Sequence, residues 1–216
     1  MRYRLLRTLC RWLAHLLFIF HGGFRVTGNA SVPQKGGVLI CPNHVCDADP
    51  PAIGAALDRE AWFMAKSELF SMPILRCLLP AVHAFPIRRD SADRAALSRA
   101  EELLRAGEAV VIFPEGGGNV EGTLQPLHPG ALLLALRTKV PVVPVALFHT
   151  NKVVPYGATR PQKSSEPVRV EFGEPLDFSD LHGKKGAVDE ATKRLTERLA
   201  QMLGQPIPEG KPQKHD

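Results

Sequence analysis

The chain has 216 residues, and with 44% hydrophobic and 23% charged residues its composition excludes wholesale disorder and predicts one folded core. The formal net charge of +5 favours an anionic partner. Nucleic acid is not expected to be that partner, because only 6% of the residues are aromatic and no basic stretch is interleaved with stacking residues. The four cysteines lack C-x-x-C spacing, so we expect free thiols in a reducing compartment.

The N-terminal segment combines four arginines with an apolar run that begins at Trp12 and ends at Phe20. This run is shorter than the ~20 apolar residues of a transmembrane helix. We expect an amphipathic helix over residues 1–22 that binds the membrane lipid surface at its cytoplasmic face, as a peripheral or monotopic anchor whose arginines face anionic headgroups. The alternatives are a helix packed on the core and a signal peptide, although no small-x-small cleavage site follows.

Short apolar runs then alternate with segments of helical periodicity. The expected strands cover residues 37–41, 61–65, 109–113, 140–148 and 168–172. The expected helices cover residues 50–57, 68–79, 92–106, 129–137 and 188–203. This alternation predicts an α/β fold with a single domain, residues 23–204, whose mostly parallel central sheet is flanked by helices. The tail, residues 205–216, is rich in Pro, Lys and Gly and is expected to be flexible.

A polar loop follows the first of these strands and carries His44 and Asp49 before two prolines that open a helix. Open α/β sheets bind ligands beyond the carboxyl ends of their strands, where this loop is expected. A histidine can take a proton from an alcohol near neutral pH, and a carboxylate on its other ring nitrogen fixes the tautomer. Asp49 and Asp47 could each supply that carboxylate, whereas the structural alternative is that Asp49 only caps the helix.

The strand at 109–113 ends in a glycine-rich turn that contains Glu115, Gly116 and Gly117. Backbone N–H groups in such a turn can approach an anion or a developing oxyanion closely. The turn lacks the glycine patterns of Walker and dinucleotide-binding loops. Taken alone, it equally fits an ordinary turn with a solvated Glu115.

Two further segments stand out by their residue types. Arg88 and Arg89 follow a short apolar run, and arginine grips phosphate through two hydrogen bonds, although a surface pair is often only solvated. Pro141 and Pro144 interrupt the apolar run 140–148. Because proline donates no hydrogen bond, this strand is expected at a sheet edge, at a bulge or beside a ligand groove.

Four segments, taken in this order over residues 37–145, resemble the motif blocks of the glycerolipid acyltransferase superfamily. They are Asn43-His44 with Asp49, Phe85 to Arg89, Phe113-Pro114-Glu115-Gly116, and Val140 to Pro144. The resemblance implies an O-acyltransferase of phospholipid biosynthesis that moves a fatty acyl group to the free hydroxyl of 1-acylglycerol-3-phosphate or a related lysophospholipid. It implies acyl-CoA or acyl-acyl carrier protein as the donor substrate, with no cofactor and no metal.

The resemblance also implies a mechanism. His44 would be the general base that removes the proton of the acceptor hydroxyl, and Asp49 would orient it. Backbone amides at Gly116 and Gly117 are the candidates for stabilising the tetrahedral oxyanion. No serine or cysteine stands where a covalent acyl-enzyme needs one, so the transfer is expected to be direct.

The same resemblance implies an acceptor site. Arg89, with Arg88 as the lesser candidate, would hold the acceptor phosphate or another anionic headgroup, and Glu115 would position the acceptor or brace its loop. The family usually continues the Phe-Pro-Glu-Gly block with Thr-Arg, whereas this chain has Gly117-Gly118. That arginine is generally assigned to acceptor binding, so its replacement leaves the nature of the acceptor open.

Three other functions fit parts of the pattern. One is a non-catalytic peripheral membrane-binding protein, in which the basic first helix and an anion pocket are the whole function. Another is an acyl-thioester hydrolase, in which water replaces the alcohol. The third is a metal site built from His44, Asp47 and Asp49, but a lone histidine with two acids makes an incomplete ligand set.

Overall fold

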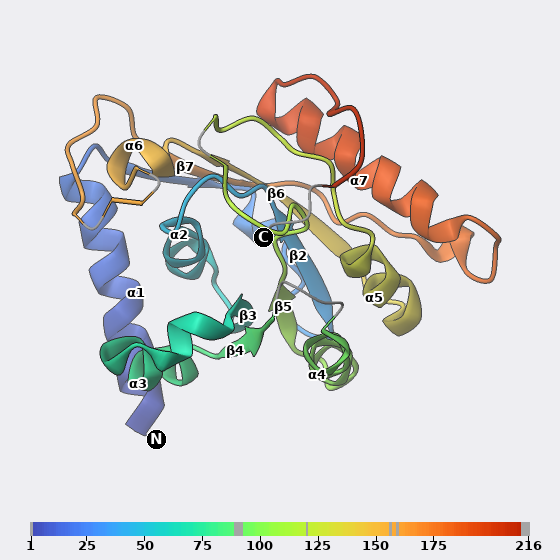
Figure 1. Cartoon of the computed structure of the whole chain (residues 1–216), viewed down its shortest axis with the longest axis horizontal. Coiled ribbons are helices and arrows are strands. Elements are labelled where there is room, and N and C mark those ends of the chain that lie inside the picture. Colours follow the sequence, from blue (N-terminus) through green and yellow to red (C-terminus); the bar gives the residue numbers. More distant parts are fainter. Residues whose placement is uncertain (1, 89–92, 120, 156, 159, 213–216) are drawn as a thin grey trace.

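The computed structural model describes residues 2–88, 93–119, 121–155, 157–158 and 160–212. Within them, one seven-stranded sheet runs through the molecule in the order β1-β7-β6-β2-β5-β3-β4 (Figure 1). The strands are β1 (Phe24–Thr27), β2 (Val38–Pro42), β3 (Ala61–Lys66), β4 (Ala84–Ile87), β5 (Ala109–Val111), β6 (Val142–Phe148) and β7 (Val168–Phe172). β7 is antiparallel to β6 and all other neighbouring pairs are parallel, so the mostly parallel sheet is confirmed.

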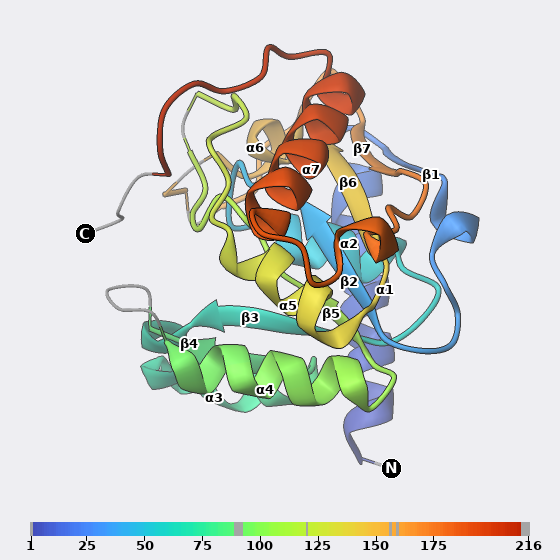
Figure 2. The same cartoon turned by 90° about the vertical axis from the view of Figure 1, so that its right-hand side faces the viewer.

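Helices cover both faces of this sheet, as expected for a single α/β domain. The α-helices in the described residues are α1 (Arg2–Phe20), α2 (Asp49–Ala56), α3 (Pro73–Ala81), α4 (Arg94–Arg105), α5 (Gly130–Thr138), α6 (Thr150–Val153) and α7 (Ala187–Leu203). Short 3-10 helices occur at η1 (Asn29–Ser31), η2 (Ser67–Ser71) and η3 (Ser179–Leu181). α1 and α2 pack on one face, and α4, α5 and α7 pack on the other (Figures 1 and 2).

The central strand β2 shows why its sequence is continuously apolar. All five of its residues are buried. Leu39 and Cys41 lie in the core formed with α4, α5 and α7, whereas Val38 and Ile40 lie in the core formed with α1 and α2. A strand that is covered on both faces needs an uninterrupted apolar run rather than an alternating one.

Helix α1 buries one side and exposes an apolar stripe on the other. Phe18 is fully buried and stacks on Phe24 of β1, with ring centroids 5.3 Å apart. The exposed apolar stripe consists of Leu5, Leu9, Trp12, Leu13, Leu16, Ile19 and Phe20. These residues recur at helical spacing and so share one side of α1. In the described part of the chain, no helix has both the length and the apolar content needed to cross a membrane.

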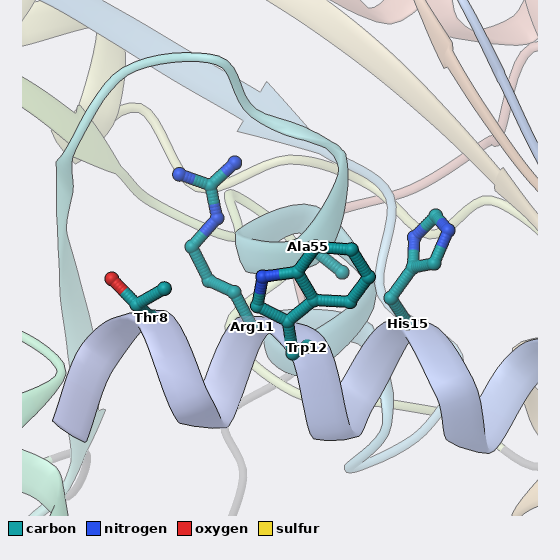
Figure 3. Close-up of a pocket in the computed structure, with 5 residues that line it drawn as sticks. All are labelled: Thr8, Arg11, Trp12, His15 and Ala55. Carbon is teal, nitrogen blue, oxygen red and sulfur yellow. The ribbon is translucent and has the colours of Figure 1, made fainter. Parts of the chain in front are cut away.

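Two arginines of α1 turn toward the protein. The guanidinium of Arg7 bonds to the ring of His83 and, at 2.8 Å, to the carboxylate of Glu60. Arg11 donates to the carbonyl of Leu57, the C-cap of α2, beside a pocket that Figure 3 shows between α1 and α2. The expectation that all four N-terminal arginines face lipid headgroups is therefore wrong for these two, because acceptors within the fold bind them.

Strand β6, which carries the prolines, lies in the middle of the sheet between β7 and β2, so the edge position considered from the sequence is wrong. The structure has a bulge there instead. Val145 pairs with Phe172, and Val142 pairs with Leu176. Val142 and Val145 are three residues apart on β6, whereas their partners Phe172 and Leu176 are four residues apart. The segment opposite β6 therefore contains one extra residue, which is a β-bulge. It lies next to Pro144, which has no N–H to donate.

The main differences from the sequence-based expectation are two strands, the short helix α6, the earlier end of β5 at Val111 and one divided helix. β1 and β4 were not expected, because each has only four residues and β4 contains Pro86, so neither shows a readable alternation. Both lie at the edges of the sheet. The helix expected at 68–79 is divided into η2 and α3, because Pro73 opens a new helix.

Candidate active site

Four neighbouring strands share one rung of the sheet, formed in β2, β5, β3 and β4 by Ile40, Val111, Phe63 and Ala84. These strands are parallel, so their carboxyl ends meet at the same edge, where open α/β sheets bind ligands. The residues four positions beyond the rung are His44, Glu115, Ser67 and Arg88. This carboxyl edge therefore collects three of the segments that the sequence singled out.

His44 lies in the loop between β2 and α2, residues 43–48, which we call the histidine loop. Nδ1 of its ring lies 2.8 Å from Oδ2 of Asp49. Because a carboxylate only accepts hydrogen bonds, Nδ1 carries the ring proton and Nε2 is the basic nitrogen. Asp47, the other acid considered from the sequence, is exposed. The expected contact between a histidine and a carboxylate is present, with Asp49 as the partner.

The carboxylate of Asp49 is fully buried and binds the histidine loop rather than its own helix. Its Oδ2 also accepts the backbone amides of Val45 at 2.6 Å and Cys46 at 2.9 Å, and Oδ1 accepts the thiol of Cys46 at 3.7 Å. Asp49 is the first residue of α2, whose N-cap is Ala48. The alternative in which Asp49 only caps the helix is therefore wrong, because these contacts fold the loop around the ring.

Glu115 braces the same loop from the turn after β5. Its Oε1 accepts the backbone amide of His44 at 2.6 Å, and its Oε2 accepts the amide of Gln125 at 2.8 Å. Burial raises the pKa of Glu115 to about 8, while the two amide hydrogen bonds act in the opposite direction and the charge of Asp49 adds to the increase. Glu115 is only 2% exposed, so the alternative of a solvated side chain is wrong.

Asn43 ties the histidine loop to β6, a role for which sequence reasoning had no assignment. Its Nδ2 donates to the carbonyl of Leu147 at 3.3 Å, and its Oδ1 accepts the amide of Leu147 at 2.7 Å. An asparagine amide can replace a backbone peptide in this way because it carries a donor and an acceptor. The one sequence signal for this role is a polar residue placed directly after an apolar strand.

The ring of His44 is covered on one face and open at one edge. It packs on Phe113 with ring centroids 4.2 Å apart, and the residue is 6% exposed. Nε2 has no hydrogen-bond partner among the described residues. The buried polar atoms that lack a partner are in other residues, so Nε2 is not buried. This nitrogen therefore keeps contact with solvent, as a base that receives a proton from a substrate must.

The glycine turn packs closely on the histidine loop. The amide of Gly116 donates to the carbonyl of Phe113 at 3.1 Å. It is therefore not free to bind an oxyanion, contrary to the expectation from the sequence. Among the described residues, no acceptor pairs with the amide of Gly117. A Cβ at Gly118 would lie 3.3 Å from the carbonyl carbon of Val45. A side chain at this position would press on the histidine loop, which is a physical reason for glycine where the family has arginine.

Arg88 follows β4, which lies three places from β2 in the strand order. Its side chain is exposed, and its backbone amide donates to Asp93 at 2.9 Å. Arg89, the first choice for the acceptor headgroup, lies outside the described residues. Within the residues that are described, no three His, Cys, Asp or Glu side chains gather to hold a metal ion.

Comparison with known proteins decides the family. A family model described as Acyltransferase matches residues 23–148, a range that holds His44, Asp49 and Glu115. The chain belongs to the acyltransferase family. Among its relatives, the 1-acyl-sn-glycerol-3-phosphate acyltransferase of Bacillus subtilis is 29% identical over 202 residues, which cover 91% of this chain and 98% of that acyltransferase.

Two further acyltransferases bear on the assignment. The lyso-ornithine lipid O-acyltransferase of Pseudomonas aeruginosa is 32% identical over 145 residues, 67% of this chain and 54% of that protein. The crystal structure of the 1-acyl-sn-glycerophosphate acyltransferase PlsC from Thermotoga maritima matches 94% of this chain and 78% of its own, with a TM-score of 0.74 and 22% identity, and shows the same fold. The chain is therefore an O-acyltransferase.

Proposed function

We propose that the chain transfers a fatty acyl group from a thioester, acyl-CoA or acyl-acyl carrier protein, to the free hydroxyl of 1-acylglycerol-3-phosphate or a related lysophospholipid. The observation that carries this proposal is the ring of His44, which Asp49 holds with Nε2 open at the carboxyl edge of the sheet. The Bacillus subtilis relative, which aligns over nearly the whole chain, is named for this acceptor.

In the proposed reaction, His44 is the general base. Nε2 takes the proton of the acceptor hydroxyl while the hydroxyl oxygen bonds to the thioester carbonyl carbon, which gives a tetrahedral intermediate. Asp49 keeps the ring in the correct tautomer and stabilises the imidazolium that forms. When the carbon–sulfur bond breaks, the imidazolium returns the proton to the departing thiolate, so that the base is regenerated.

The chemistry of Cys46 favours direct transfer over a covalent acyl-enzyme. This cysteine is the nucleophilic side chain closest to His44 in the sequence. Burial, together with the charge of Asp49, raises the pKa of its thiol to about 12. The thiolate is the nucleophilic form of cysteine, so a thiol with this pKa is inert near neutral pH.

The amide of Gly117 is the proposed donor to the oxyanion of the tetrahedral intermediate. It belongs to the turn that packs on the histidine loop, and among the described residues it has no acceptor of its own. A backbone amide that is already fixed in place needs no reorganisation when negative charge develops on the carbonyl oxygen.

The acceptor headgroup has a specific alternative. Gly118 stands where the family usually carries an arginine, and a Cβ there would lie only 3.3 Å from the backbone of Val45, so a side chain would need the histidine loop to shift slightly. The relative from Pseudomonas aeruginosa is named for an acceptor without a phosphate in its name, lyso-ornithine lipid. A lysolipid that lacks a phosphate is therefore the second candidate acceptor.

The exposed apolar stripe of α1 supports attachment to a lipid surface. Trp12, in the middle of the stripe, is 61% exposed. A helix of 19 residues with one apolar side can lie in the plane of the membrane interface, where a lysophospholipid is also found. We propose peripheral or monotopic attachment at the cytoplasmic face, whose reducing environment fits four free thiols.

The test incubates the purified chain, or its His44→Ala variant, with a labelled acyl thioester and a panel of lysolipids, followed by lipid mass spectrometry. We expect an acylated lipid from the unmodified chain, and turnover about 10²–10⁴-fold lower for the variant with an unchanged circular dichroism spectrum. Free fatty acid without acylated lipid would indicate a hydrolase. Vesicle binding without either product would indicate a non-catalytic membrane protein.

A further inference from the structure

A second cavity, of about 350 Å³, lies where β4 ends and α4 begins. α4 packs against β4 and β5 (Figure 2). The polar part of its lining consists of Ser67, Arg88, Asp93 and Arg99, and the rest is apolar. We call this cavity the α4 pocket. The proposed chemistry of His44 does not use it.

The lining of the α4 pocket is basic because its two arginines outnumber its one acid, Asp93. Oδ2 of Asp93 accepts the amide of Arg88 at 2.9 Å, and Oδ1 accepts the amides of Ala95 and Ala96 at 3.1 Å each. These bonds place Asp93 as the N-cap of α4 and fix the backbone of Arg88 beside it. The carboxylate keeps its negative charge, but its oxygens are taken up by backbone amides, and the two arginines leave the lining with a net positive charge that can attract an anion.

Arg99 is held in position at the wall of the pocket. Its guanidinium lies 5.5 Å from the ring centroid of Trp62 and 3.0 Å from Glu102 on the same helix. The cation–π contact orients the side chain, whereas the exposed ion pair with Glu102 is weak and can be exchanged for a ligand. With Arg88, the pocket then offers two planar donor groups of the kind that binds phosphate.

The α4 pocket lies well away from the proposed base. Asp49, which holds His44, belongs to α2 on one face of the sheet, whereas α4 packs on the opposite face. β2 and β4 are separated by β5 and β3, and three strand spacings amount to roughly 14 Å. A ligand that reaches both places must extend along the carboxyl edge, past Ser67 in the row between them.

This separation distinguishes the two substrates. In 1-acylglycerol-3-phosphate, four bonds join the free hydroxyl oxygen to phosphorus, so with bonds of about 1.5 Å these atoms lie at most about 5 Å apart. In an acyl thioester of phosphopantetheine, fourteen bonds join the carbonyl carbon to phosphorus, a reach of roughly 17 Å. Only the phosphate of the donor matches the distance.

We propose that the α4 pocket binds the phosphate of the phosphopantetheine arm that coenzyme A and acyl carrier protein share, with Arg88 and Arg99 as its ligands. The inference rests on the proposed function, because the arm must bring its thioester to His44. It moves Arg88 from the acceptor, for which the resemblance suggested it, to the donor. Ser67 lies where its hydroxyl can bond to an amide of the arm.

The test measures binding of 4′-phosphopantetheine, pantetheine and coenzyme A to the full chain by calorimetry. We expect phosphopantetheine to bind at least about tenfold more tightly than pantetheine, and Arg88→Gln or Arg99→Gln to weaken phosphopantetheine binding by about tenfold without affecting pantetheine. Arg105→Gln is the matched control, because Arg105 lies on the same helix but pairs with Glu101 outside the pocket.

Kinetics complete the test. Arg88→Gln and Arg99→Gln should raise KM for both acyl-CoA and acyl-acyl carrier protein and leave KM for the lysophospholipid unchanged.

Two kinetic results would overturn the inference. A higher KM for the lysophospholipid alone would assign the pocket to the acceptor, and a higher KM for acyl-CoA alone would assign it to the nucleotide of coenzyme A. Acyl transfer without discrimination between phosphopantetheine and pantetheine also overturns it. Discrimination that both arginine variants abolish supports it even if no acyl transfer is found, in which case the proposed function alone fails.

Discussion

Asp49 serves two purposes in the histidine loop, since its carboxylate accepts from the ring of His44 and from the backbone amides of Val45 and Cys46. An asparagine could still accept from the loop, but it would no longer favour the imidazolium. We therefore expect Asp49→Asn to lower kcat by about 10²–10⁴-fold. KM should change little for either substrate, because the lost interaction belongs to the transition state. Steady-state kinetics with both substrates measure this.

The matched control for this variant is Asp47→Asn, because Asp47 lies in the same loop but is exposed. Its kcat should equal that of the unmodified chain. An equal loss in both variants would mean that the loop as a whole tolerates no change. A normal kcat for Asp49→Asn would remove Asp49 from the mechanism.

Glu115 gives a pH-dependent prediction. Burial raises its pKa to about 8 in the folded chain, above the ordinary value of 4.5 that we take for the unfolded chain, so the folded state binds the proton more tightly. The stability that this group contributes is complete below about pH 4.5 and is lost as the pH rises through about 8. Relative to Glu115→Gln, the free energy of unfolding should therefore fall by on the order of 3–5 kcal/mol over this range.

Urea unfolding of both proteins at a series of pH values measures this difference. The Gln variant is the reference because it keeps the size of the side chain and does not titrate. A difference that stays constant with pH would contradict the raised pKa. A difference that grows with pH would mean that the hydrogen bonds from His44 and Gln125 outweigh burial.

The sequence predicts single residues well where the interaction is local and poorly where it crosses strands. His44 and Asp49 belong to one short loop and helix start, so the spacing limited the carboxylate partner to Asp47 or Asp49, and the structure has Asp49. Glu115 reaches His44 because β5 is the neighbour of β2, and Asn43 reaches Leu147 because β6 is the other neighbour. The order of strands in the sheet is a property of the whole fold, which local spacing does not encode.

At the scale of elements, α1 has two sides that should be separable by mutation. Phe18 fills a core site at full burial, so Phe18→Ala should lower the free energy of unfolding by about 3–5 kcal/mol. Leu9 and Leu13 lie on the exposed stripe, so changing both to Gln should leave stability nearly unchanged. It should weaken binding to lipid vesicles by about 100-fold or more, since each leucine contributes roughly 1.5–3 kcal/mol when it is buried.

Thermal unfolding and vesicle co-sedimentation measure the two effects separately. The clearest support is a crossed result, in which folded Phe18→Ala still binds vesicles and the double Gln variant still unfolds at the original temperature. If the double variant unfolds early, the stripe packs against protein rather than lipid. If it binds vesicles normally, attachment occurs elsewhere on the chain.

The elements that the sequence predicts best are the buried ones. β2 is apolar throughout because both of its faces are covered, and a continuous run of this kind is easily recognised. β1 and β4 are too short to carry a pattern, and they take their strand conformation from a single neighbour at the edge. Pro144 correctly signalled an irregularity, but proline cannot indicate whether that irregularity is an edge or a bulge.

For the whole molecule, parallel strands explain why segments distant in the sequence meet at one edge of the sheet. They do not explain how far apart these segments lie along that edge. The family resemblance placed the segments around His44, Glu115 and Arg88 in one site, and in the structure each of them follows the end of a parallel strand. The structure separates Arg88 from His44 by three strand spacings and places its pocket beside α4. A motif resemblance orders residues along the chain, whereas their separation across the sheet depends on strand order.

The net charge of the whole molecule also needs a correction from the structure. A charge of +5 suggests that attraction to anionic lipid drives attachment. Arg7 and Arg11, however, are bound by acceptors within the fold, and the outward stripe of α1 carries apolar side chains. Attachment should therefore depend mainly on apolar burial, which salt does not screen.

Vesicle binding at two salt concentrations tests this balance. Raising the salt from about 0.1 M to about 1 M shortens the Debye length from about 10 Å to about 3 Å and removes most attraction between exposed charges. We expect binding to anionic vesicles to weaken by no more than about 30-fold, the effect of one or two basic residues at roughly 1 kcal/mol each. Binding to neutral phosphatidylcholine vesicles should not weaken, because no ionic attraction is lost. A loss of more than about 100-fold on anionic vesicles, with no binding to neutral ones, would mean that basic residues rather than the stripe hold the chain at the membrane.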